Sequence, residues 1–466
     1  MTINNKNIDN VFYIFVTTHL IIWTLIPSFT NHNLPLDTIE ALAWGSNLDW
    51  GFNKHPPMSA FFSEVFFKIF GPFDWAYYFL SQIFIVSTFF IIWKFSEDFF
   101  QNKNFSLISV LILEGIFFYN FTTPEFNVNV AQIPFWALSV YYLWKCIKYD
   151  KAIDYLFLGL FIGLGILSKY LFIYLVLAIK LVFIYMIKKG KKIKLSHYFI
   201  AGPVTLLILL PHLIWLTENN YITITYGLHR SADIFYAGEP RFLNHLKYPA
   251  VFLFKQILLM TPFFLMILFV VNKFKIKFNF KDKKTAFLIA INIIPFVLVF
   301  LTSLFFGINI RTMWMTPFYL FYGVMVIYIL QKYINLKKIN LFYSVFLFLF
   351  IISPSLYLFN SVAKKDQRID YPAKEVALEV KKNWNRTFKN DIDFVVGEAW
   401  WAGNLSYHLD SRPKFIRGYL NFVKKEIRPD QGIVYIESES SKLTKKCPGE
   451  FFIIQSRYVC MVGVNK

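Results

Sequence analysis

Long apolar segments recur along this chain, and they constrain its fold more than any other feature of the sequence. About eleven of them are long enough to cross the hydrocarbon core of a bilayer as helices. A chain that is 56% hydrophobic and 20% aromatic is also too apolar for an ordinary soluble globule. We therefore predict a polytopic all-α membrane bundle with about eleven transmembrane helices, at residues 11–29, 75–93, 105–119, 128–144, 155–168, 170–187, 198–217, 249–271, 285–306, 312–331 and 339–359.

The basic residues indicate how this bundle is oriented. Lysines are concentrated in alternate connections, as in KKGKKIK at 188–194 and in the segment 273–284, whereas the intervening connections contain few. Because cytoplasmic loops carry the excess of Lys and Arg, the sequence predicts a cytoplasmic N-terminus and an outer C-terminus (N-in/C-out). Much of the net charge of +19 then reflects membrane topology. No nucleic-acid partner is indicated.

The polar C-terminal part has the composition of a separate small domain. Residues 1–360 are predicted to form the transmembrane domain, with outer loops at 30–74 and 218–248, and residues 361–466 a soluble α/β domain. The stretch YPAKEVALEVKKNW at 371–384 has the pattern of an amphipathic helix, and DFVVG, GIVYI and FFIIQ have that of short buried strands. Cys447 and Cys460 are compatible with a disulfide in an oxidising compartment or with two buried thiols.

The first outer loop, DTIEALAWGSNLDWGFNKHPP at 37–57, brings acidic and basic residues together beside an apolar span. Asp37 and Glu40 stand at N-cap and N3 spacing, which is compatible with a simple helix cap. From Pro57 to Ile69, however, apolar residues recur at helical spacing and predict a second helix that lies in the membrane interface. The two helices would hold the carboxylates, together with Lys54 and His55, at headgroup depth.

This mixture of side chains favours a functional site over a structural loop. A carboxylate within reach of a hydroxyl acts as a general base, while Lys, Arg and His neutralise the charge on a departing phosphate. At the interface, such a site suits a substrate whose phosphate lies at headgroup level and whose tail stays in lipid. Polyprenyl phosphates that carry a sugar have this shape.

Further candidates come from other predicted outer connections. Glu125 is a second candidate carboxylate, and Lys169 and Arg311 are candidate phosphate ligands, although a solvated or lipid-headgroup position would also explain them. His212 is interpreted as a packed or hydrogen-bonded residue at a helix end. A divalent metal stays open and no other cofactor is indicated, since the loop at 218–248 has no zinc-type spacing among His229, Arg230, Asp233, Glu239, Arg241 and His245.

Some motifs are absent from the sequence. It contains no GxxxxGK[ST], no GxGxxG with its acidic partner and no CxxC, so nucleotide hydrolysis, dinucleotide binding and thiol redox chemistry lack support. A carrier of lipid or solute is the alternative from a different class. The chain shows no paired halves with matching broken helices, and its carboxylates gather at one face rather than at the membrane midplane.

The first outer loop, with Asp37, Glu40 and the Lys54-His55-Pro56-Pro57 sequence, resembles that of the GT-C glycosyltransferases. The similarity is to the group of families 39 and 83, which includes protein O-mannosyltransferases and bacterial lipid A aminoarabinose transferases. Here Thr38 and Ile39 separate the two acids, whereas the acids of many relatives are adjacent. Other stretches resemble the family in the same order along the chain: TTPEFNVNVAQIPFWAL at 122–138, GLGILSKY at 163–170, PHLIWL at 211–216 and VVGEAWWAGNLSYHLDSRP at 395–413.

The resemblance implies transfer of a sugar from a polyprenyl-phosphate donor at the periplasmic side of a bacterial inner membrane. It implies catalytic roles for Asp37, Glu40 and Glu125, with the working carboxylate left open, and contacts to the donor phosphate from Lys54, His55, Lys169 and Arg311. Lipid A or a related envelope glycolipid is the expected acceptor, and a protein hydroxyl is the alternative. The sugar itself is not indicated.

Overall fold

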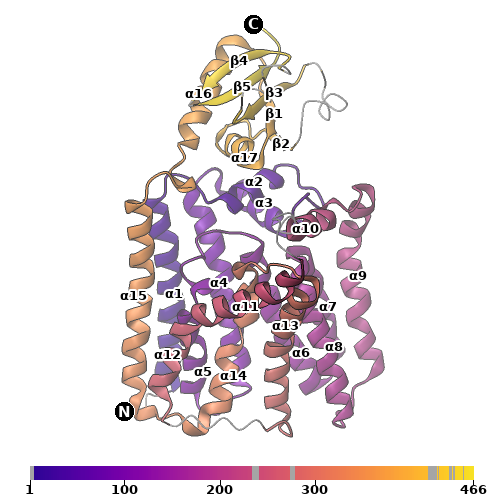
Figure 1. The fold of residues 1–466 in the computed structure, drawn as a ribbon, viewed down its shortest axis with the longest axis vertical. Coiled ribbons are helices and arrows are strands. Elements are labelled where there is room, and N and C mark those ends of the chain that lie inside the picture. Colours follow the sequence, from indigo (N-terminus) through magenta and orange to yellow (C-terminus); the bar gives the residue numbers. More distant parts are fainter. Residues whose placement is uncertain are drawn as a thin grey trace.

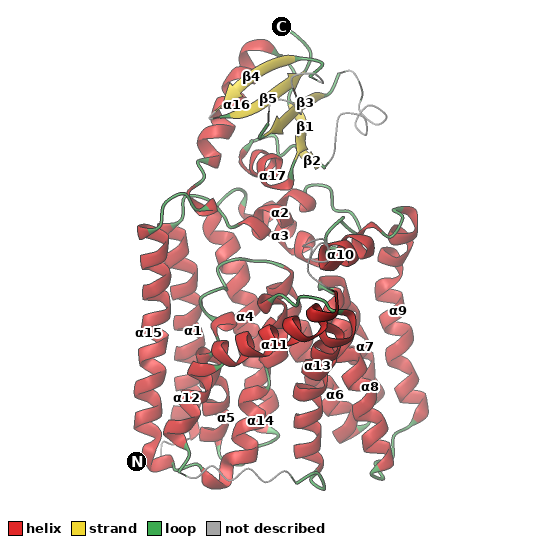
Figure 2. Ribbon diagram, viewed as in Figure 1, coloured by secondary structure: helices red, strands yellow, loops and turns green. Residues whose placement is uncertain are grey.

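A helical body carries a small sheet-containing domain at one end (Figures 1 and 2). The computed structural model describes residues 5–232, 241–272, 279–417, 428, 430–439, 443, 447–454 and 456–466. The helices of the body are α1 Asn5–Thr30, α2 Leu36–Gly45, α3 Met58–Phe70, α4 Asp74–Glu97, α5 Lys103–Leu111, η1 Ile112–Gly115, η2 Phe117–Tyr119, α6 Val128–Tyr149, α7 Ala152–Ser168, η3 Tyr170–Phe172, α8 Ile173–Lys188, α9 Leu195–Glu218, α10 Ile222–Ala232, α11 Arg241–Leu259, α12 Thr261–Val270, α13 Lys283–Phe306, η5 Thr312–Tyr319, α14 Tyr322–Leu330, η6 Gln331–Tyr333, η7 Leu336–Lys338 and α15 Ile339–Ala363.

The helices of the body are those of a multi-pass membrane protein. In the described part of the chain, 6 helices are long and apolar enough to cross a membrane, or up to 8 if each of two bent pairs is one span. The bent pairs are α11 with α12, at 47°, and η5 with the helix that follows it, at 52°. Each of the eleven apolar segments in the sequence falls on one helix or on consecutive helices. The number of eleven spans and the N-in/C-out orientation stay predictions.

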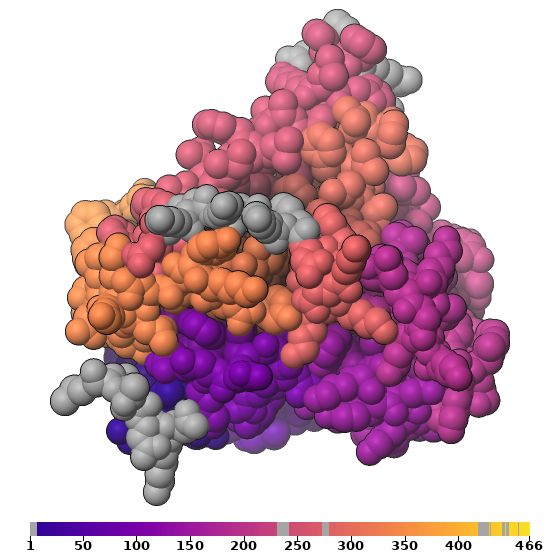
Figure 3. Space-filling model, turned by 90° about the horizontal axis from the view of Figure 1, so that it is seen from below, coloured from indigo at the N-terminus to yellow at the C-terminus, as the bar shows by residue number. Residues whose placement is uncertain are grey.

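Helices distant in sequence pack side by side in the body. α1 packs against α4 and α15, and α5 packs against α14. Viewed from the end opposite the C-terminal domain, the purple surface of early segments adjoins the orange surface of later ones (Figure 3). One continuous core of aromatic and aliphatic side chains joins them, with Phe12, Phe89, Trp93 and Trp136 almost fully buried.

Two short helices, α2 and α3, lie between the bundle and the C-terminal domain (Figure 1). The helix predicted at 57–69 is present as α3, and Gly71, at φ 69°, ends it. The helix cap considered for Asp37 is wrong, because Pro35 is the N-cap of α2 and no side chain caps it. At Gly45 the two helices approach so closely that an added Cβ would lie 2.9 Å from the carbonyl oxygen of Ala60.

The C-terminal domain is an α/β unit, as predicted. It contains η8 Arg368–Asp370, α16 Ala373–Thr387, β1 Ile392–Gly397, α17 Ala399–His408, β2 Lys414–Ile416, β3 Gly432–Glu437, β4 Glu450–Ile454 and β5 Arg457–Val462. The sheet order is β2-β1-β3-β5-β4, with β1 parallel to β2 and β3, and with β5 antiparallel to β3 and β4. The disulfide between Cys447 and Cys460, one of the two alternatives, is present. The division of the chain at residue 360 stays a prediction.

The C-terminal domain packs directly on α2 and α3. An added Cβ on Gly403 of α17 would lie 3.0 Å from the Cβ of Ala43 in α2. Arg412 donates from Nη2 to Oε2 of Glu64 in α3 and to the carbonyl oxygen of Leu42, both at 2.7 Å. The helix that carries Asp37 and Glu40 is therefore held from both sides.

Candidate active site

A cavity of about 360 Å³ opens beside α2 at the end of the bundle that carries the C-terminal domain. Its lining comes from α2, from the loop before α3, from the breaks after α7 and before η5, and from α10. Six of the seven candidate residues line it, although they come from four separate segments: Asp37, Glu40, Lys54, His55, Lys169 and Arg311.

The seventh candidate, Glu125, lies behind the first turn of α2. Its Oε1 accepts a hydrogen bond of 3.0 Å from the backbone N–H of Asp37. The neighbouring hydroxyl of Thr38 donates to the carbonyl oxygen of Phe126 at 3.1 Å. The loop at 125–126 is thus joined to the start of α2, and two carboxylates that are distant in sequence become neighbours.

Burial changes the acidity of both carboxyls. It raises the pKa of Glu125 to about 8, and the charge of Asp37 adds to the effect. Burial also raises the pKa of Asp37, and Glu40 adds to this, whereas Lys54 and Lys169 oppose it. At neutral pH the arrangement therefore favours a protonated Glu125 beside Asp37.

Glu40 and Lys54 form an ion pair on the cavity wall. The ammonium of Lys54 thereby balances the negative charge of Glu40. Asp37 is then the carboxylate better placed to accept a proton. His55 lies next to this pair, and its ring meets that of Trp44 edge-on at 5.9 Å. Burial, with the charges of Lys169 and Lys54, lowers the pKa of His55 to about 3. His55 is therefore uncharged at neutral pH, and a hydrogen bond rather than a charge is what it offers to a phosphate.

Lys169 occupies the break between two helices that the sequence predicts. α7 ends at Ser168, and Lys169 adopts an extended conformation before the chain turns into η3. Its ammonium donates to Oδ1 of Asn129 and lies 5.5 Å from the ring centroid of Trp314. Burial lowers the pKa of Lys169 to about 7; Arg311 also lowers it, and Asp37 opposes the shift.

Three residues that the sequence did not predict as part of the site also line this cavity: Asn129, Arg230 and Trp314. Arg230 donates from Nη1 to the hydroxyl of Tyr226 at 2.6 Å. Asn129 lies in the first turn of α6, which Asn127 caps, and this turn follows the segment that carries Glu125. Nothing in the sequence indicated Arg230 as part of this cavity.

No metal centre is evident in the described part of the chain, where no group of three or more His, Cys, Asp and Glu side chains could hold an ion. Asp233 and Glu239 lie outside the described residues, as does the side chain of Arg241. His245 bonds to the carbonyl oxygen of Leu304 at 2.8 Å, and His229 lines a different cavity. His212 is hydrogen-bonded as interpreted, to the hydroxyl of Tyr170 and the carbonyl oxygen of Trp50, both at 2.7 Å.

Comparisons with known proteins show what this chain is similar to. Residues 54–215 match the family model described as dolichyl-phosphate-mannose-protein mannosyltransferase. This stretch is thus similar to a glycosyltransferase family, and the resemblance seen in the sequence is confirmed. Glu125, Lys54, His55 and Lys169 lie inside the matched region. No curated protein matches the whole sequence significantly.

Among solved structures, the chain is similar to ArnT from Cupriavidus metallidurans bound to undecaprenyl phosphate. The TM-score is 0.64 at 10% identity, over 96% of this chain and 97% of that one. The apo state of the same protein gives a TM-score of 0.62 at 10% identity and the same coverage. The archaeal oligosaccharyltransferase AglB from Archaeoglobus fulgidus, in complex with an inhibitory peptide and a dolichol-phosphate, gives 0.45 at 10% identity, over 90% of this chain and 69% of that one. The similarity to ArnT establishes the fold.

Proposed function

We propose that this protein transfers a sugar from a polyprenyl-phosphate donor to a hydroxyl or phosphate of lipid A or a related envelope glycolipid. The observation that supports this most is the composition of the cavity. Asp37 lines the cavity together with four basic residues, Lys54, Lys169, Arg230 and Arg311. A general base opposite a cluster of cations is what displacement of a lipid phosphate requires.

The proposed step needs no further reactant. The Asp37 carboxylate takes the proton of the acceptor hydroxyl, and the acceptor oxygen forms a bond to the anomeric carbon of the sugar. The bond from that carbon to the phosphate oxygen breaks, and both of its electrons leave with the polyprenyl phosphate. Lys169 and Arg311 donate hydrogen bonds to the leaving phosphate and neutralise its negative charge. Such charge-assisted hydrogen bonds are stronger than those between neutral groups.

The two other carboxyls have supporting roles in this proposal. Glu125 fixes the start of α2 through the N–H of Asp37. A proton on Glu125 avoids repulsion between two adjacent carboxylates, which would otherwise raise the pKa of Asp37 further. Glu40 holds Lys54 on the cavity wall.

The location follows from the same proposal. We place the protein in a bacterial inner membrane, with the site and the C-terminal domain on the periplasmic side. The Cys447–Cys460 disulfide supports this, because such bonds persist in oxidising compartments. The connections on the side of the site carry fewer lysines than the opposite set, which includes the runs at 188–194 and 273–284, and this agrees with an outer face.

A protein hydroxyl is the second candidate acceptor, and the family description, which names protein mannosyltransferases, favours it. A carrier without transferase activity is the third. The cavity combines a carboxylate, cations and an uncharged histidine beside one membrane face. This position supports a carrier less than a transferase, since carrier sites lie near the membrane midplane.

The direct test compares membranes that contain wild type, Asp37→Asn or Asp49→Asn, the last an exposed carboxylate of the same loop and thus a matched control. Release of polyprenyl phosphate is followed while envelope glycolipids and proteins are profiled by mass spectrometry. Wild type and Asp49→Asn should consume donor and add a sugar mass to a glycolipid, and Asp37→Asn should not. A sugar mass on protein alone would select the second acceptor, and no donor consumption by wild type would favour the carrier.

A further inference from the structure

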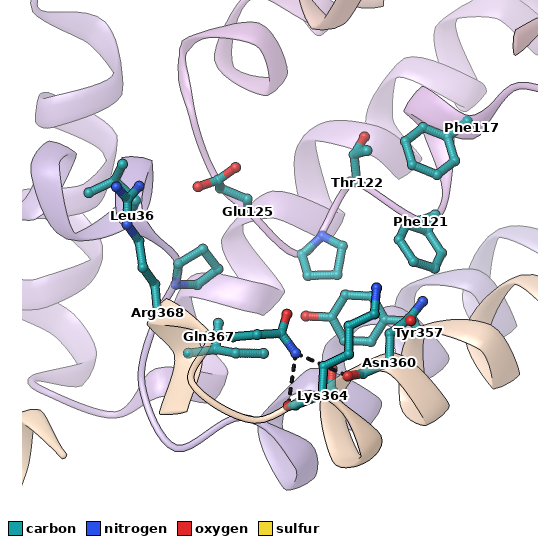
Figure 4. Close-up of a pocket in the computed structure, with 14 residues that line it drawn as sticks. Leu36, Phe117, Phe121, Thr122, Glu125, Tyr357, Asn360, Lys364, Gln367 and Arg368 are labelled. Atoms are coloured by element: carbon teal, nitrogen blue, oxygen red, sulfur yellow. Dashed lines mark hydrogen bonds between the residues drawn. The ribbon is translucent and has the colours of Figure 1, made fainter. Parts of the chain in front are cut away.

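The chain between α5 and α6 reaches Glu125 without a continuous helix. After α5 it forms two short 3₁₀ helices, η1 and η2, and then turns up to Asn127, which caps α6. One side of this segment lines a cavity of about 410 Å³. In Figure 4, Thr122 and Glu125 lie on one side of that cavity, and the end of α15, with Tyr357 and Asn360, lies on the other. Packing on the cavity side is therefore incomplete, and the position of Glu125 depends on contacts on the interior side.

Buried polar side chains lie on the interior side of this segment. Nδ1 of His19, in α1, lies 2.7 Å from Oε1 of Glu114 in η1. Asn120 donates from Nδ2 to the carbonyl oxygen of Glu114 at 2.8 Å, and its Oδ1 accepts from the hydroxyl of Ser353, in α15, at 3.2 Å. His19, Glu114 and Asn120 are each at most 4% exposed. The first half of the segment is thus joined to α1 and α15.

Thr123 joins the second half of the segment to α4. Its hydroxyl donates to the carbonyl oxygen of Asn120 at 2.6 Å and accepts from Nε2 of Gln82 at 3.0 Å. Only Pro124, whose ring restricts its φ, separates Thr123 from Glu125. These contacts therefore fix the direction in which the chain enters Glu125. Together the residues form what we term the interior polar cluster: His19, Gln82, Glu114, Asn120, Thr123 and Ser353.

The interior polar cluster lies in apolar surroundings. The ring of His19 meets those of Phe15 and Phe89 edge-on, with centroids 5.9 and 5.4 Å apart. Polar groups within a membrane protein are costly, and well-packed apolar side chains would fill such a space at lower cost. A buried polar network does, however, specify one arrangement of the chain, because its hydrogen bonds form only in that geometry. This cluster is therefore better explained by positioning than by stability.

We propose that the interior polar cluster positions Glu125 and, through it, the backbone of Asp37 at the start of α2. The six members are positioning residues, since none of them lines the cavity that contains Asp37. They act through the hydrogen bond that the N–H of Asp37 donates to Oε1 of Glu125. This inference rests on the proposed function, because it concerns the geometry of the proposed base. It also gives a role to His19 and Glu114, two ionisable residues of the bundle that the transfer step does not use.

The test compares Thr123→Val with Thr88→Val in the full-length protein, purified in neutral detergent. The two threonines are 0% and 1% exposed, and the hydroxyl of each donates to one carbonyl oxygen. That of Thr88 bonds to Phe84 within α4, whereas that of Thr123 holds the segment before Glu125. Both variants lose a buried hydroxyl, and only Thr123→Val should displace Glu125.

The first readout needs no turnover. Burial raises the pKa of Glu125 to about 8, the charge of Asp37 adds to the effect and that of Arg368 opposes it. The melting temperature of wild type should therefore fall between about pH 5 and pH 9. In Thr123→Val the carboxyl moves towards water, so the fall should be smaller and approach that of Glu125→Gln. Thr88→Val should keep the wild-type slope, and a wild-type slope in Thr123→Val would overturn the proposal.

The second readout separates the chemical step from binding. Thr123→Val should lower kcat about ten- to a hundredfold, because a small misplacement of a catalytic group is costly. Its affinity for polyprenyl phosphate should stay unchanged, since Lys169 and Arg311 come from other segments. Thr123→Val combined with Glu125→Ala should be no slower than Glu125→Ala alone, because both changes act through one side chain.

Additive losses in that double variant, or equal kcat in Thr123→Val and Thr88→Val, would overturn the positioning role and leave the transfer reaction intact. If wild type transfers no sugar while the melting slopes differ as expected, the proposed function fails and the positioning of Glu125 stands.

Discussion

The pairing of Asp37 with Glu125 is the residue-scale feature that most affects the chemistry. Asp37 and Glu125 are both partly buried, and a 3.0 Å hydrogen bond joins the backbone N–H of Asp37 to Oε1 of Glu125. Two adjacent buried carboxyls do not ionise independently. The pair therefore gives one carboxylate and one protonated group near neutral pH.

This pairing predicts how stability depends on pH. Glu125 has its pKa raised from 4.5 to about 8 in the folded protein. Its contribution is fully present below the unfolded value and is lost as pH rises through about 8, because the folded state then gives up a proton that it holds more tightly. We expect the melting temperature of wild type to fall between about pH 5 and pH 9, and that of Glu125→Gln, which keeps an acceptor for the N–H of Asp37, to fall less. Equal slopes in the two proteins would contradict the assignment.

Lys169 predicts the pH dependence of activity. Its pKa is lowered to about 7, so the ammonium is lost as pH rises past that value. If the charge neutralises the leaving phosphate, kcat/KM for the donor should fall above about pH 7 in wild type. Lys169→Arg should extend activity to higher pH, and Lys169→Met should lose about a hundredfold below about pH 7, with a smaller difference from wild type above that value. An unchanged profile in Lys169→Arg would show that another group titrates.

At the residue scale, the sequence indicated which side chains belong to the candidate site better than it indicated which of them are in contact. Asp37, Glu40, Lys54 and His55 lie within one loop, so their proximity was foreseeable. The contact of Asp37 with Glu125 spans 88 positions, and the approach of Trp314 to Lys169 depends on how η5 packs against α6. Such contacts are set by tertiary packing, for which a single sequence has no local signal.

At the scale of elements, the close crossing of α2 and α3 holds in place the helix that carries Asp37, the proposed base. Gly45→Ala would place a Cβ 2.9 Å from the carbonyl oxygen of Ala60 and 3.0 Å from the Cβ of Glu64. We expect the helices to separate, with a loss of about 1–3 kcal/mol in the free energy of unfolding and a fall in activity.

The matched control for this change is Gly202→Ala in α9, where an added Cβ meets nothing within 4 Å. It should be neutral or slightly stabilising, because Ala favours a helix over Gly by up to about 1 kcal/mol. Thermal unfolding in detergent compares the two variants. Equal stability of Gly45→Ala and Gly202→Ala would show that the crossing at Gly45 is not tight.

Periodicity predicted these elements unevenly. The apolar segments of the bundle all became helices, because length and hydrophobicity suffice for that assignment. The N-cap of α2 was predicted two residues too late, because Pro35 rather than Asp37 occupies that position. β5, with the sequence RYVCMV, was missed because it lacks an alternating pattern, and its place beside β3 comes from sheet packing.

At the scale of the whole molecule, the C-terminal domain and the membrane body share the helices that carry the site. Trp44, Phe52 and Ala60 of the first outer loop pack in one cluster with Trp384 and Val434 of that domain. We infer that the domain stabilises the geometry of the site, whatever it contributes to acceptor binding.

Arg412 tests this coupling. Its guanidinium joins Glu64 and Leu42 at 2.7 Å each, and Glu64 is only 6% exposed. Arg412→Gln leaves a buried charge unpaired, which costs about 3–5 kcal/mol, and activity should fall with stability. Adding Glu64→Gln to Arg412→Gln should restore part of both, because the unpaired charge is removed. If Arg412→Gln melts as wild type does, the domain is not coupled to the site through this ion pair.

The proposed reaction depends on Asp37 as the base and on the surrounding cations to bind the donor phosphate. The most direct measurement compares wild type with Asp37→Asn, as purified proteins, for binding of polyprenyl phosphate and for its release from a sugar-loaded donor. We expect Asp37→Asn to bind the lipid phosphate with unchanged or higher affinity, since a negative charge is removed, yet to release it at least about a hundredfold more slowly from the donor. Equal release by the two proteins would show that Asp37 is not the base.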